Sequence, residues 1–429
     1  MSENRILIKN GTAVVHNKCQ RVDILIENKK IARIASGIAA EEGMTVIDAK
    51  GKYITYGLAD VHVHFREPGY SAKETIETGS KAAAHGGYTT VCCMPNLNPA
   101  PDSLQNLDIE EELIDNQAVI DVRPYATITK QRKGMEAVDF ETLSPYVVGF
   151  SDDGSGVQNE AVMEEAMTHV AALKGIIAAH CEDNSLLNGG YIHEGKYAQL
   201  HHHRGICSES EWGQIKRDIT LAEKTGCHYH VCHISTKESV ELIRKAKARG
   251  VNITCETAPH YLVLTDEDLQ EDGRFKMNPP LRSAEDQFAL IEGIKDGTID
   301  CIATDHAPHT PEEKSKGLEK SAMGIVGLET AFSVVYTHLV KKNVISFEKM
   351  LELMCDNPRR IFNLKGKLEE GEFADLAIFD IDHPYTIDSS GFFSKGHSTP
   401  FEGWRVYGKC CQTIYHGKCV WKELVRSDK

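Results

Sequence analysis

Short apolar segments alternate with amphipathic helical segments through the middle of this 429-residue chain, and this alternation constrains the fold most strongly. The segments are continuously apolar, as expected of strands covered on both faces. Repeated strand–helix units are typical of a parallel sheet, and eight strands favour a (β/α)8 barrel over an open sheet. The candidate strands are YITYGLADVHVH, YTTVCCMP, VIDVRPYAT, YVVGFS, GIIAAHC, CHYHVCHI, NITCETA and TIDCIATD. We therefore predict an α/β fold with a TIM-like barrel over residues 53–365.

Two of the helices between these strands carry a capping-box pattern. The first pattern is Ser71 to Glu74, and the second is Ser235 to Glu238. Both patterns predict that a helix begins directly after the serine.

The two ends of the chain resemble each other and differ from the middle. Asn10-Gly11 lies between two apolar runs, which is a hairpin signal, and a second turn is predicted around Asn28-Lys29-Lys30. Near the C-terminus, GEFADLAIFDID is strand-like, and CQTIYHGKCVWKE predicts two strands around His416-Gly417. We predict that residues 1–52 and 366–429 together form one small β-sandwich domain.

Composition excludes several classes of partner. The formal net charge is −15 and the sequence pI is about 5.7, which argues against nucleic acid or an anionic membrane as the main partner. A small anionic substrate remains compatible, because a bound cation reverses the field inside a cleft. No apolar run approaches the roughly 20 residues of a membrane span, and the start lacks a signal-peptide pattern. The 13 scattered cysteines are best interpreted as free thiols, so we expect a cytoplasmic protein.

Residues of metal-ligand type stand where five of the predicted strands end. A single histidine in such a place is usually structural, but five strand ends of a barrel meet at one face, where catalytic groups gather. His62 and His64 are two apart on a strand and therefore point the same way, and Asp60 shares that face. The residues at the strand ends are His62, His64, the pair Asp152-Asp153, His180, His233 and Asp305.

This set predicts a metal centre. Four histidines and two aspartates exceed what one tetrahedral zinc needs, and they suit two adjacent divalent ions that share a carboxylate. Nitrogen and oxygen ligands without thiolate suit zinc and also allow cobalt or manganese. Cys232, beside His233, is expected to point away and pack as a small apolar residue. The run His201-His202-His203 lies in a polar stretch and is expected on a solvated face.

The ordered motifs DVHVHFREPG, MPNLNP, SDDG, AHCED, CHIS, ETAPHYL, MNPPLR and ATDHAPH resemble those of the dihydroorotases, of the bacterial class I type within the amidohydrolase superfamily. A histidine pair alone is shared by many hydrolases, whereas the ordered set is specific. The resemblance runs through the predicted barrel and into both flanks. It implies a barrel, a centre of two zinc ions, and a small β domain built from both termini.

Carried over by position, the resemblance implies a role for each ligand-type residue. His62, His64 and Asp305 would bind one zinc, and His180 and His233 the second. Asp153 would bridge both ions; Asp152 is the alternative, and Asp153 is preferred because it precedes Gly154, where the strand must turn. Hydantoinases and allantoinases bridge their metals with a carboxylated lysine, and VVGFSDDG contains no lysine.

The resemblance also implies a reaction, the reversible cyclisation of N-carbamoyl-L-aspartate to (S)-dihydroorotate and water in de novo pyrimidine biosynthesis. Asp305 would move a proton between the attacking water and the leaving nitrogen. The substrate carboxylate needs a cation, and the planar fork of Arg66 matches it. The expected substrate-binding residues are His64, Arg66, Asn96, Asn278 and His309. Simpler roles are a surface salt bridge for Arg66 and turn or loop positions for the two asparagines.

Alternatives remain open from the sequence. Another cyclic amidohydrolase, such as an allantoinase or dihydropyrimidinase, would use a similar centre, and some members of the superfamily are metal-free scaffolding proteins. A homodimer is expected by resemblance alone. The polar, turn-rich segment HAPHTPEEKSKG, residues 306–317, is expected to close over the substrate.

Overall fold

Two parallel sheets occupy the middle of the chain in the computed structural model, which describes residues 5–15 and 18–423. One sheet has the order β6-β7-β8 and the other has the order β14-β13-β12-β9. Their strands are β6 (Leu58–Val63), β7 (Tyr88–Cys93), β8 (Asp121–Pro124), β9 (Ile176–Ala179), β12 (His228–Val231), β13 (Ile253–Thr257) and β14 (Cys301–Ile302). Seven of the eight predicted strands therefore have a counterpart here.

Single parallel bridges link these two sheets at both of their edges. At one edge Val63, at the end of β6, pairs with His306 beyond β14. At the other edge Phe150 pairs with Ala126 beyond β8 and with Ile177 in β9. The parallel pairing thus continues from each sheet into the other.

The fourth expected strand, residues 146–151, is the one without a strand ladder. Val148 N donates to Pro124 O at 3.1 Å, and Phe150 N donates to Ile176 O on the other side at 2.9 Å. Extended pairing covers too few residues here to make a regular strand.

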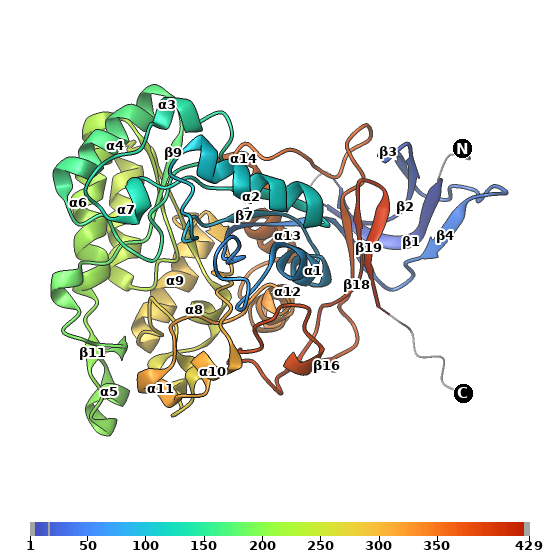
Figure 1. The fold of residues 1–429 in the computed structure, drawn as a ribbon. Coiled ribbons are helices and arrows are strands. Elements are labelled where there is room, and N and C mark those ends of the chain that lie inside the picture. Colours follow the sequence, from blue (N-terminus) through green and yellow to red (C-terminus); the bar gives the residue numbers. More distant parts are fainter. Residues whose placement is uncertain (1–4, 16–17, 424–429) are drawn as a thin grey trace.

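A third, mixed sheet has eight strands and combines both ends of the chain. Its order is β19-β18-β15-β5-β1-β2-β3, with β4 paired to β1. Figure 1 shows the blue N-terminal strands β1 and β2 beside the red C-terminal strands β18 and β19. The strands are β1 (Ile6–Val15), β2 (Lys18–Glu27), β3 (Lys30–Ala35), β4 (Thr45–Asp48), β5 (Tyr53–Tyr56), β15 (Leu376–Asp380), β18 (Lys409–Tyr415) and β19 (Lys418–Lys422).

The stretch expected as the first barrel strand divides at Gly57 into β5 of the mixed sheet and β6 of a parallel sheet. Gly57 N donates to Asp375 O at 2.8 Å, and Gly57 O accepts from Arg359 Nη2 at 2.7 Å. A Cβ at this position would lie 2.1 Å from Thr89 Oγ1. Only glycine fits this approach, and both of its polar backbone atoms are used outside a strand ladder.

Two of the three predicted turns in the mixed sheet are confirmed. The turn at Asn28-Lys29 joins β2 to β3, and the turn at His416-Gly417 joins β18 to β19, all with positive φ. The hairpin predicted at Asn10-Gly11 is wrong, because β1 runs through it and its register with β2 shifts between Ile8 and Gly11. Asn10 N donates to Asp23 Oδ1 at 2.7 Å, so the local signal marks a bulge.

The helices cover the parallel strands, and their caps differ from the predicted ones. The first begins after Thr75, whose side chain accepts from Thr78 N in a capping box, and Glu74 lies outside it. The helix after β12 has Thr236 as its N-cap instead of Ser235. The helices are α1 (Ile76–Gly86), α2 (Leu104–Gln117), α3 (Phe140–Leu143), α4 (Glu160–Ala172), α5 (Lys196–His201), α6 (Glu209–Thr225), α7 (Lys237–Ala248), α8 (Pro259–Val263), α9 (Ala284–Asp296), α10 (Pro311–Lys314), α11 (Gly317–Lys320), α12 (Ala331–Val335), α13 (Phe347–Leu351) and α14 (Asn357–Ile361).

Short elements complete the described chain. Two-residue strands pair as β10 (Ile192–His193) with β11 (Gly205–Ile206), and as β16 (Tyr385–Thr386) with β17 (Arg405–Val406). The 3-10 turns are η1 (Lys130–Arg132), η2 (Asn184–Leu186), η3 (Asp266–Asp268), η4 (Gly273–Phe275) and η7 (Ser389–Gly391). Two π-helical turns are η5 (Tyr336–Val340) and η6 (Glu352–Asp356).

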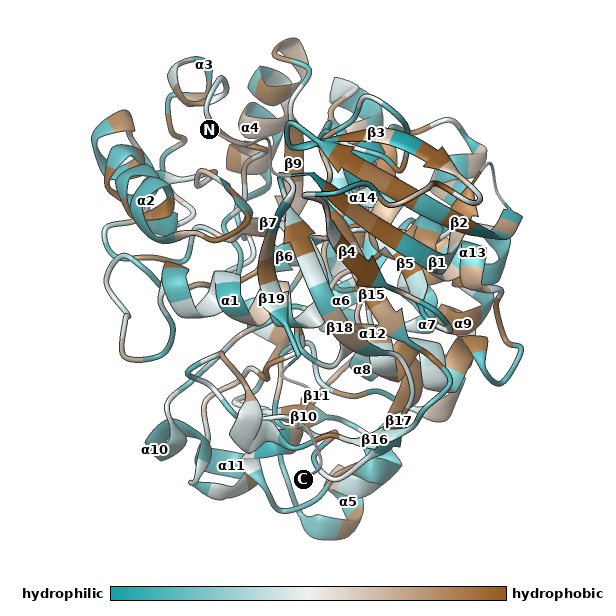
Figure 2. Cartoon of the chain, turned by 90° about the vertical axis from the view of Figure 1, so that its right-hand side faces the viewer, coloured by the Kyte–Doolittle hydropathy of each residue, from teal (hydrophilic) through white to brown (hydrophobic). Residues whose placement is uncertain are grey.

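The main core lies between the parallel strands and the surrounding helices. In Figure 2, β7, β9 and β15 are predominantly hydrophobic, whereas α10 and α11 are mostly hydrophilic. A second core cluster lies within the mixed sheet around Ile8, Ile24 and Ile54. Within residues 5–15 and 18–423, no helix combines the length and the apolar character that crossing a membrane requires.

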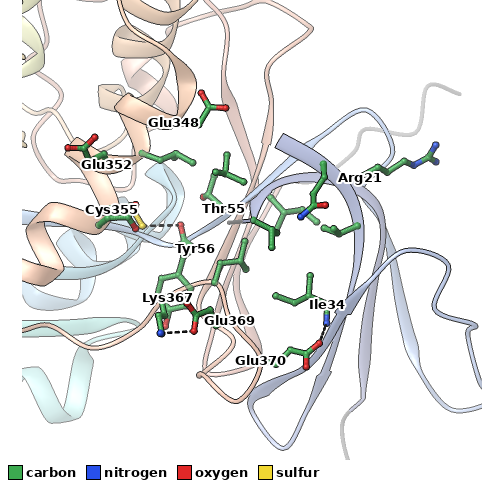
Figure 3. A pocket seen from close by; sticks show the side chains of 18 of the residues that line it. Arg21, Ile34, Thr55, Tyr56, Glu348, Glu352, Cys355, Lys367, Glu369 and Glu370 are labelled. Atoms are coloured by element: carbon green, nitrogen blue, oxygen red, sulfur yellow. Dashed lines mark hydrogen bonds and ion pairs between the residues drawn. The ribbon is translucent and has the colours of Figure 1, made fainter. Parts of the chain in front are cut away.

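A cleft of about 1150 Å³ lies between the mixed sheet and the helical segment of α13 and η6. Figure 3 shows Arg21, Ile34 and Thr55 on the sheet side of this cleft, and Glu348 and Glu352 on its helical side. Its lining includes none of the residues predicted for the site. This cleft is therefore not the predicted site, which is identified by its metal-ligand residues.

Candidate metal centre

The six predicted ligand residues come together and are all buried. They lie at or just beyond the carboxyl ends of the parallel strands, the end at which catalytic groups gather in folds of this kind. His62 is the last residue but one of β6, and His64 follows that strand; His180 follows β9, His233 follows β12, Asp153 follows the Phe150 bridge, and Asp305 follows β14.

Asp153 is the shared member of this cluster. Its Oδ1 lies 3.3 Å from His62 Nε2, 3.4 Å from His233 Nε2 and 3.7 Å from His180 Nδ1. Its Oδ2 lies 3.4 Å from His64 Nε2. Asp153 belongs to two groups of possible metal ligands, one with His62 and His64 and the other with His180 and His233. Within each group, the ligand atoms all lie within 4.8 Å of one another.

Asp305 closes the cluster from the β14 side. Its Oδ1 lies 3.0 Å from His64 Nε2 and 3.5 Å from His62 Nε2. Burial by itself raises the pKa of Asp305, but the hydrogen bond from His64 and the charge of His62 lower it overall. The carboxylate is therefore ionised at neutral pH.

The residues present fit a divalent cation. Among the described residues, His62 Nε2, Asp153 Oδ1, His180 Nε2 and His233 Nδ1 are buried without a hydrogen-bond partner. Leaving such atoms unpaired costs about 1–3 kcal/mol each, and a coordinated cation removes that cost. Although burial raises the pKa of Asp153, the adjacent His62 and His233 hold it well below its usual range, so the shared group is a carboxylate.

Asp152 and Asp153 have different surroundings, although they are adjacent in sequence. Asp152 accepts from Ile128 N at 2.8 Å and Thr129 N at 3.1 Å, and also from the Thr129 hydroxyl. Asp152 thereby holds the neighbouring backbone, while Asp153 reaches into the histidine cluster.

Glu256, at the end of β13, is a site residue that the sequence reasoning missed. Its Oε1 lies 2.6 Å from His62 Nδ1, and its Oε2 lies 3.1 Å from His230 Nε2. Because a carboxylate only accepts, His62 Nδ1 carries the proton and His62 Nε2 is left to coordinate. Burial raises the pKa of Glu256, but the charges of His62 and His230 and their hydrogen bonds lower it far more.

Two further neighbours shape the β6 end of the cluster. Asp60 accepts from His62 N at 3.0 Å and from Thr304 N at 3.0 Å, so it joins two strand ends as a scaffold. Cys232 does pack in an apolar cluster, yet its sulfur also lies within 4.8 Å of ligand atoms of His62 and Glu256. The expectation that Cys232 points away from the site is therefore wrong.

Asn96 contacts the cluster directly, whereas Asn278 contacts Glu182, which lies beside His180. Asn96 Oδ1 accepts from His64 Nδ1 at 2.8 Å, which leaves His64 Nε2 facing Asp153 and Asp305. Asn278 Nδ2 donates to Glu182 Oε1 at 2.9 Å. Each asparagine therefore fixes a charged or coordinating neighbour.

Arg66 and His309 lie together beside the cluster. Arg66 is 8% exposed, and among the described residues its one side-chain hydrogen bond runs from Nε to Pro308 O at 3.3 Å, so its terminal nitrogens are left for a ligand. His309 Nε2 donates to Met323 O at 2.8 Å. Burial and the charge of Arg66 lower the pKa of His309 to about 3, so this imidazole is neutral.

Three of these residues have strained backbones. Arg66, His233 and Asp305 have φ values of 62°, 36° and 47°, in the left-handed region that non-glycine residues rarely adopt. Such strain gathers at functional sites, where the surrounding fold holds side chains in place. The triplet His201-His202-His203 lies outside the cluster at the end of α5, with His201 and His202 exposed as expected.

Comparison with known proteins agrees with this site. The family model for Dihydro-orotase-like proteins matches residues 51–239. A dihydroorotase of Fusobacterium nucleatum is 50% identical over 418 residues, covering 97% of this chain and 98% of that protein. Dihydroorotases of Bacillus cytotoxicus and Staphylococcus aureus are each 49% identical, covering 98% and 96% of this chain and 97% and 98% of theirs.

Solved structures of hydantoinases have the same fold. An L-hydantoinase (dihydropyrimidinase) from Arthrobacter aurescens aligns with a TM-score of 0.87 at 28% identity, covering 97% of this chain and 96% of that one. A D-hydantoinase (dihydropyrimidinase) from Thermus sp. aligns with a TM-score of 0.84 at 26% identity, covering 98% of both chains. Since relatives named dihydroorotase match nearly the whole chain at 49–50% identity, the chain belongs to the dihydroorotase family.

Proposed function

We propose that this protein is a dihydroorotase of the bacterial class I type, which interconverts N-carbamoyl-L-aspartate and (S)-dihydroorotate plus water in de novo pyrimidine biosynthesis. The observation that carries the proposal is the buried cluster of four histidines around Asp153, with Arg66 at its side. The histidine cluster around Asp153 can hold a metal ion next to an amide carbonyl. Arg66 fits the carboxylate that distinguishes dihydroorotate from uncarboxylated rings.

We also propose the fold that the same family resemblance implies. The two parallel sheets and their bridges at Val63 and Phe150 support one closed (β/α)8 barrel over residues 53–365. The mixed sheet supports a small β-sandwich domain from residues 1–52 and 366–429. Because β5 pairs in the mixed sheet, the boundary between the two domains is best drawn at Gly57.

Two zinc ions are the proposed cofactors. His62, His64 and Asp305 would hold one ion, His180 and His233 the other, and Asp153 both. When bound, such ions supply Lewis acidity and lower the pKa of water to near neutrality.

The chain's own residues manage protons and orientation. In the hydrolytic direction, a water oxygen bonds to the ring amide carbonyl, the C–N bond breaks, and the ring nitrogen gains a proton. Asp305, ionised and 3.0 Å from His64, takes the proton from the attacking water and returns it to the leaving nitrogen. His64, held by Asn96, fixes the side of the cluster at which this transfer occurs.

The free carboxylate of the substrate is the proposed ligand of Arg66, with Asn96 Nδ2 as a further hydrogen-bond donor. Neutral His309, whose Nε2 proton is donated to Met323 O, would pack against the substrate without donating to its carboxylate. Asn278 would contact the ring from the side of Glu182. Burial of Arg66 excludes water from this pair and strengthens it.

Hydantoinases and dihydropyrimidinases share the fold, so the rival is another cyclic amidohydrolase. Asp153 stands where those relatives are expected to carry a carboxylated lysine, and Arg66 has no use on an uncarboxylated ring. A metal-free scaffolding role would not need four unpaired ligand atoms buried together.

The test is to assay the purified protein against dihydroorotate, dihydrouracil and allantoin, with metal analysis of the same sample. We expect turnover of dihydroorotate and about two zinc ions per chain. Faster turnover of dihydrouracil or allantoin would favour the rival enzyme, and a folded protein without metal would favour the scaffold. We also propose a cytoplasmic homodimer, on family resemblance; sedimentation as a monomer at micromolar concentration would refute the dimer.

A further inference from the structure

Lys314, in α10, has its ammonium group buried in a cage of three backbone carbonyls. The residue is 7% exposed, and Nζ donates to Gly324 O at 2.7 Å, Ala322 O at 2.8 Å and Lys276 O at 3.0 Å. An ammonium has three donors, so every proton is used. None of the three acceptors is a carboxylate, which makes this a joint between backbone segments instead of an ion pair.

The three carbonyls flank two proposed substrate contacts. Ala322 and Gly324 stand on either side of Met323, whose carbonyl accepts from His309 Nε2 at 2.8 Å. Lys276 comes two residues before Asn278, on the segment after β13. One side chain thus connects the backbone that holds His309 to the backbone that carries Asn278.

Further contacts tie the same two segments together. Gly324 N donates to Lys276 O at 3.1 Å, and Lys276 Nζ donates to Glu319 O at 2.6 Å. A Cβ on Gly273 would lie 2.3 Å from Lys314 O and 2.4 Å from Ser321 Oγ, so the segments are in close contact. Lys314 stands at the centre of these contacts.

We propose that Lys314 is a positioning residue that locks residues 306–324 onto the segment bearing Asn278 and so sets the places of His309 and Asn278 around the substrate. This inference rests on the proposed function. It makes the segment a fixed wall of the site, in contrast to the closing loop expected from its polar sequence. Neither His309 nor Asn278 is reached by Lys314 directly; the effect passes through the carbonyls.

The charge state of Lys314 sets the conditions of the test. Burial and the charge of Lys276 lower its pKa to about 7, against the charges of Asp272 and Glu313. A neutral amine has only two donors and would release one carbonyl. The variants are therefore compared below pH 7, where the ammonium form prevails.

The experiment compares Lys314→Met with Lys316→Met, an exposed lysine of the same segment. For Lys314→Met, KM for dihydroorotate should rise about tenfold while kcat changes less than about twofold and the zinc content is kept, because binding groups move and the metal centre does not. Amide hydrogen exchange in residues 306–324 should accelerate. Lys316→Met should match the wild type in both measurements.

A rescue experiment separates positioning from general damage. Lys314→Ala leaves the carbonyl cage open, so added propylammonium should lower its KM toward the wild-type value, and propanol should not. Unchanged KM in folded, metal-loaded Lys314→Met overturns the proposal. Fast exchange of the wild-type Gly324 amide, which donates to Lys276 O, overturns it as well and needs no variant to fold. A wild type that does not turn over dihydroorotate refutes the proposed function, while hydrogen exchange still tests the anchor.

Discussion

At the scale of single residues, the site depends on groups that bind Nδ1 of His62 and His64 and so leave Nε2 of each free. Glu256 Oε1 accepts a hydrogen bond from His62 Nδ1, and Asn96 Oδ1 accepts one from His64 Nδ1. In Glu256→Gln the carbonyl can still accept from His62, but the charge is lost; in Glu256→Leu both are lost.

We therefore expect metal affinity to fall about tenfold in Glu256→Gln and about 100-fold in Glu256→Leu. Metal retention against a competing chelator measures this. Glu241→Gln, on the exposed face of α7, serves as the control. Equal retention in all of these proteins would show that Glu256 does not tune the centre.

Asp305→Asn removes the proposed proton carrier but leaves four histidines and Asp153. The expected result is a loss in kcat of about 10²- to 10⁴-fold with zinc still bound. Steady-state rates and metal content on one preparation check it, and undiminished turnover would remove Asp305 from the mechanism.

Arg66→Met removes the cation proposed to bind the substrate carboxylate while keeping much of the buried stem. KM for dihydroorotate should rise far more than KM for dihydrouracil, which lacks that group. KM is measured for both substrates with the wild type and the variant. A similar loss on both rings would mean that Arg66 supports the fold of the site and does not recognise the carboxylate.

At the scale of elements, the strand ends could be predicted from sequence but their neighbours could not. His62, His180, His233 and Asp305 stand out because apolar runs stop at them. Glu256 also ends a strand, yet its role depends on His62 and His230, which are distant in sequence. Likewise, Asn10-Gly11 gives the same local signal for a hairpin and for a bulge, and only pairing with β2 decides between them.

The division of β5 from β6 is another tertiary effect, and Gly57 tests it. In Gly57→Ala the new Cβ would meet Thr89 at 2.1 Å, so the free energy of unfolding should fall by about 1–3 kcal/mol. Urea denaturation measures this. Gly391→Ala has open space and should be close to neutral. Equal stability of both variants would contradict a tight junction at Gly57.

At the scale of the whole molecule, buried His193 and half-buried His228 make the fold sensitive to acid. Burial, followed by the charge of Arg282, lowers the pKa of His193 from 6.5 to about 4. Burial, followed by the charge of His230, lowers the pKa of His228 by the same amount. Between pH 6.5 and 4, each of these two histidines binds more protons in the unfolded chain than in the folded one. The stability that they contribute is therefore kept above pH 6.5 and lost as the pH falls toward 4.

The urea concentration at the midpoint of unfolding, measured between pH 7 and pH 5, tests the direction of this pH dependence. Each histidine contributes a slope of at most about 1.4 kcal/mol per pH unit. His228→Gln should flatten the pH dependence relative to the wild type, and an unchanged dependence in this variant would contradict the prediction.

The mixed sheet also bears on how the chain is made. Strand β5 pairs with β1 on one side and with β15 on the other, and β15 begins only at Leu376. While the ribosome is still synthesising the barrel, one edge of β5 has no native partner, and such an edge invites pairing with other chains. Nascent or truncated chains that stop before Leu376 are therefore the ones most prone to aggregate, even where the ligand residues, all before residue 306, have already been synthesised.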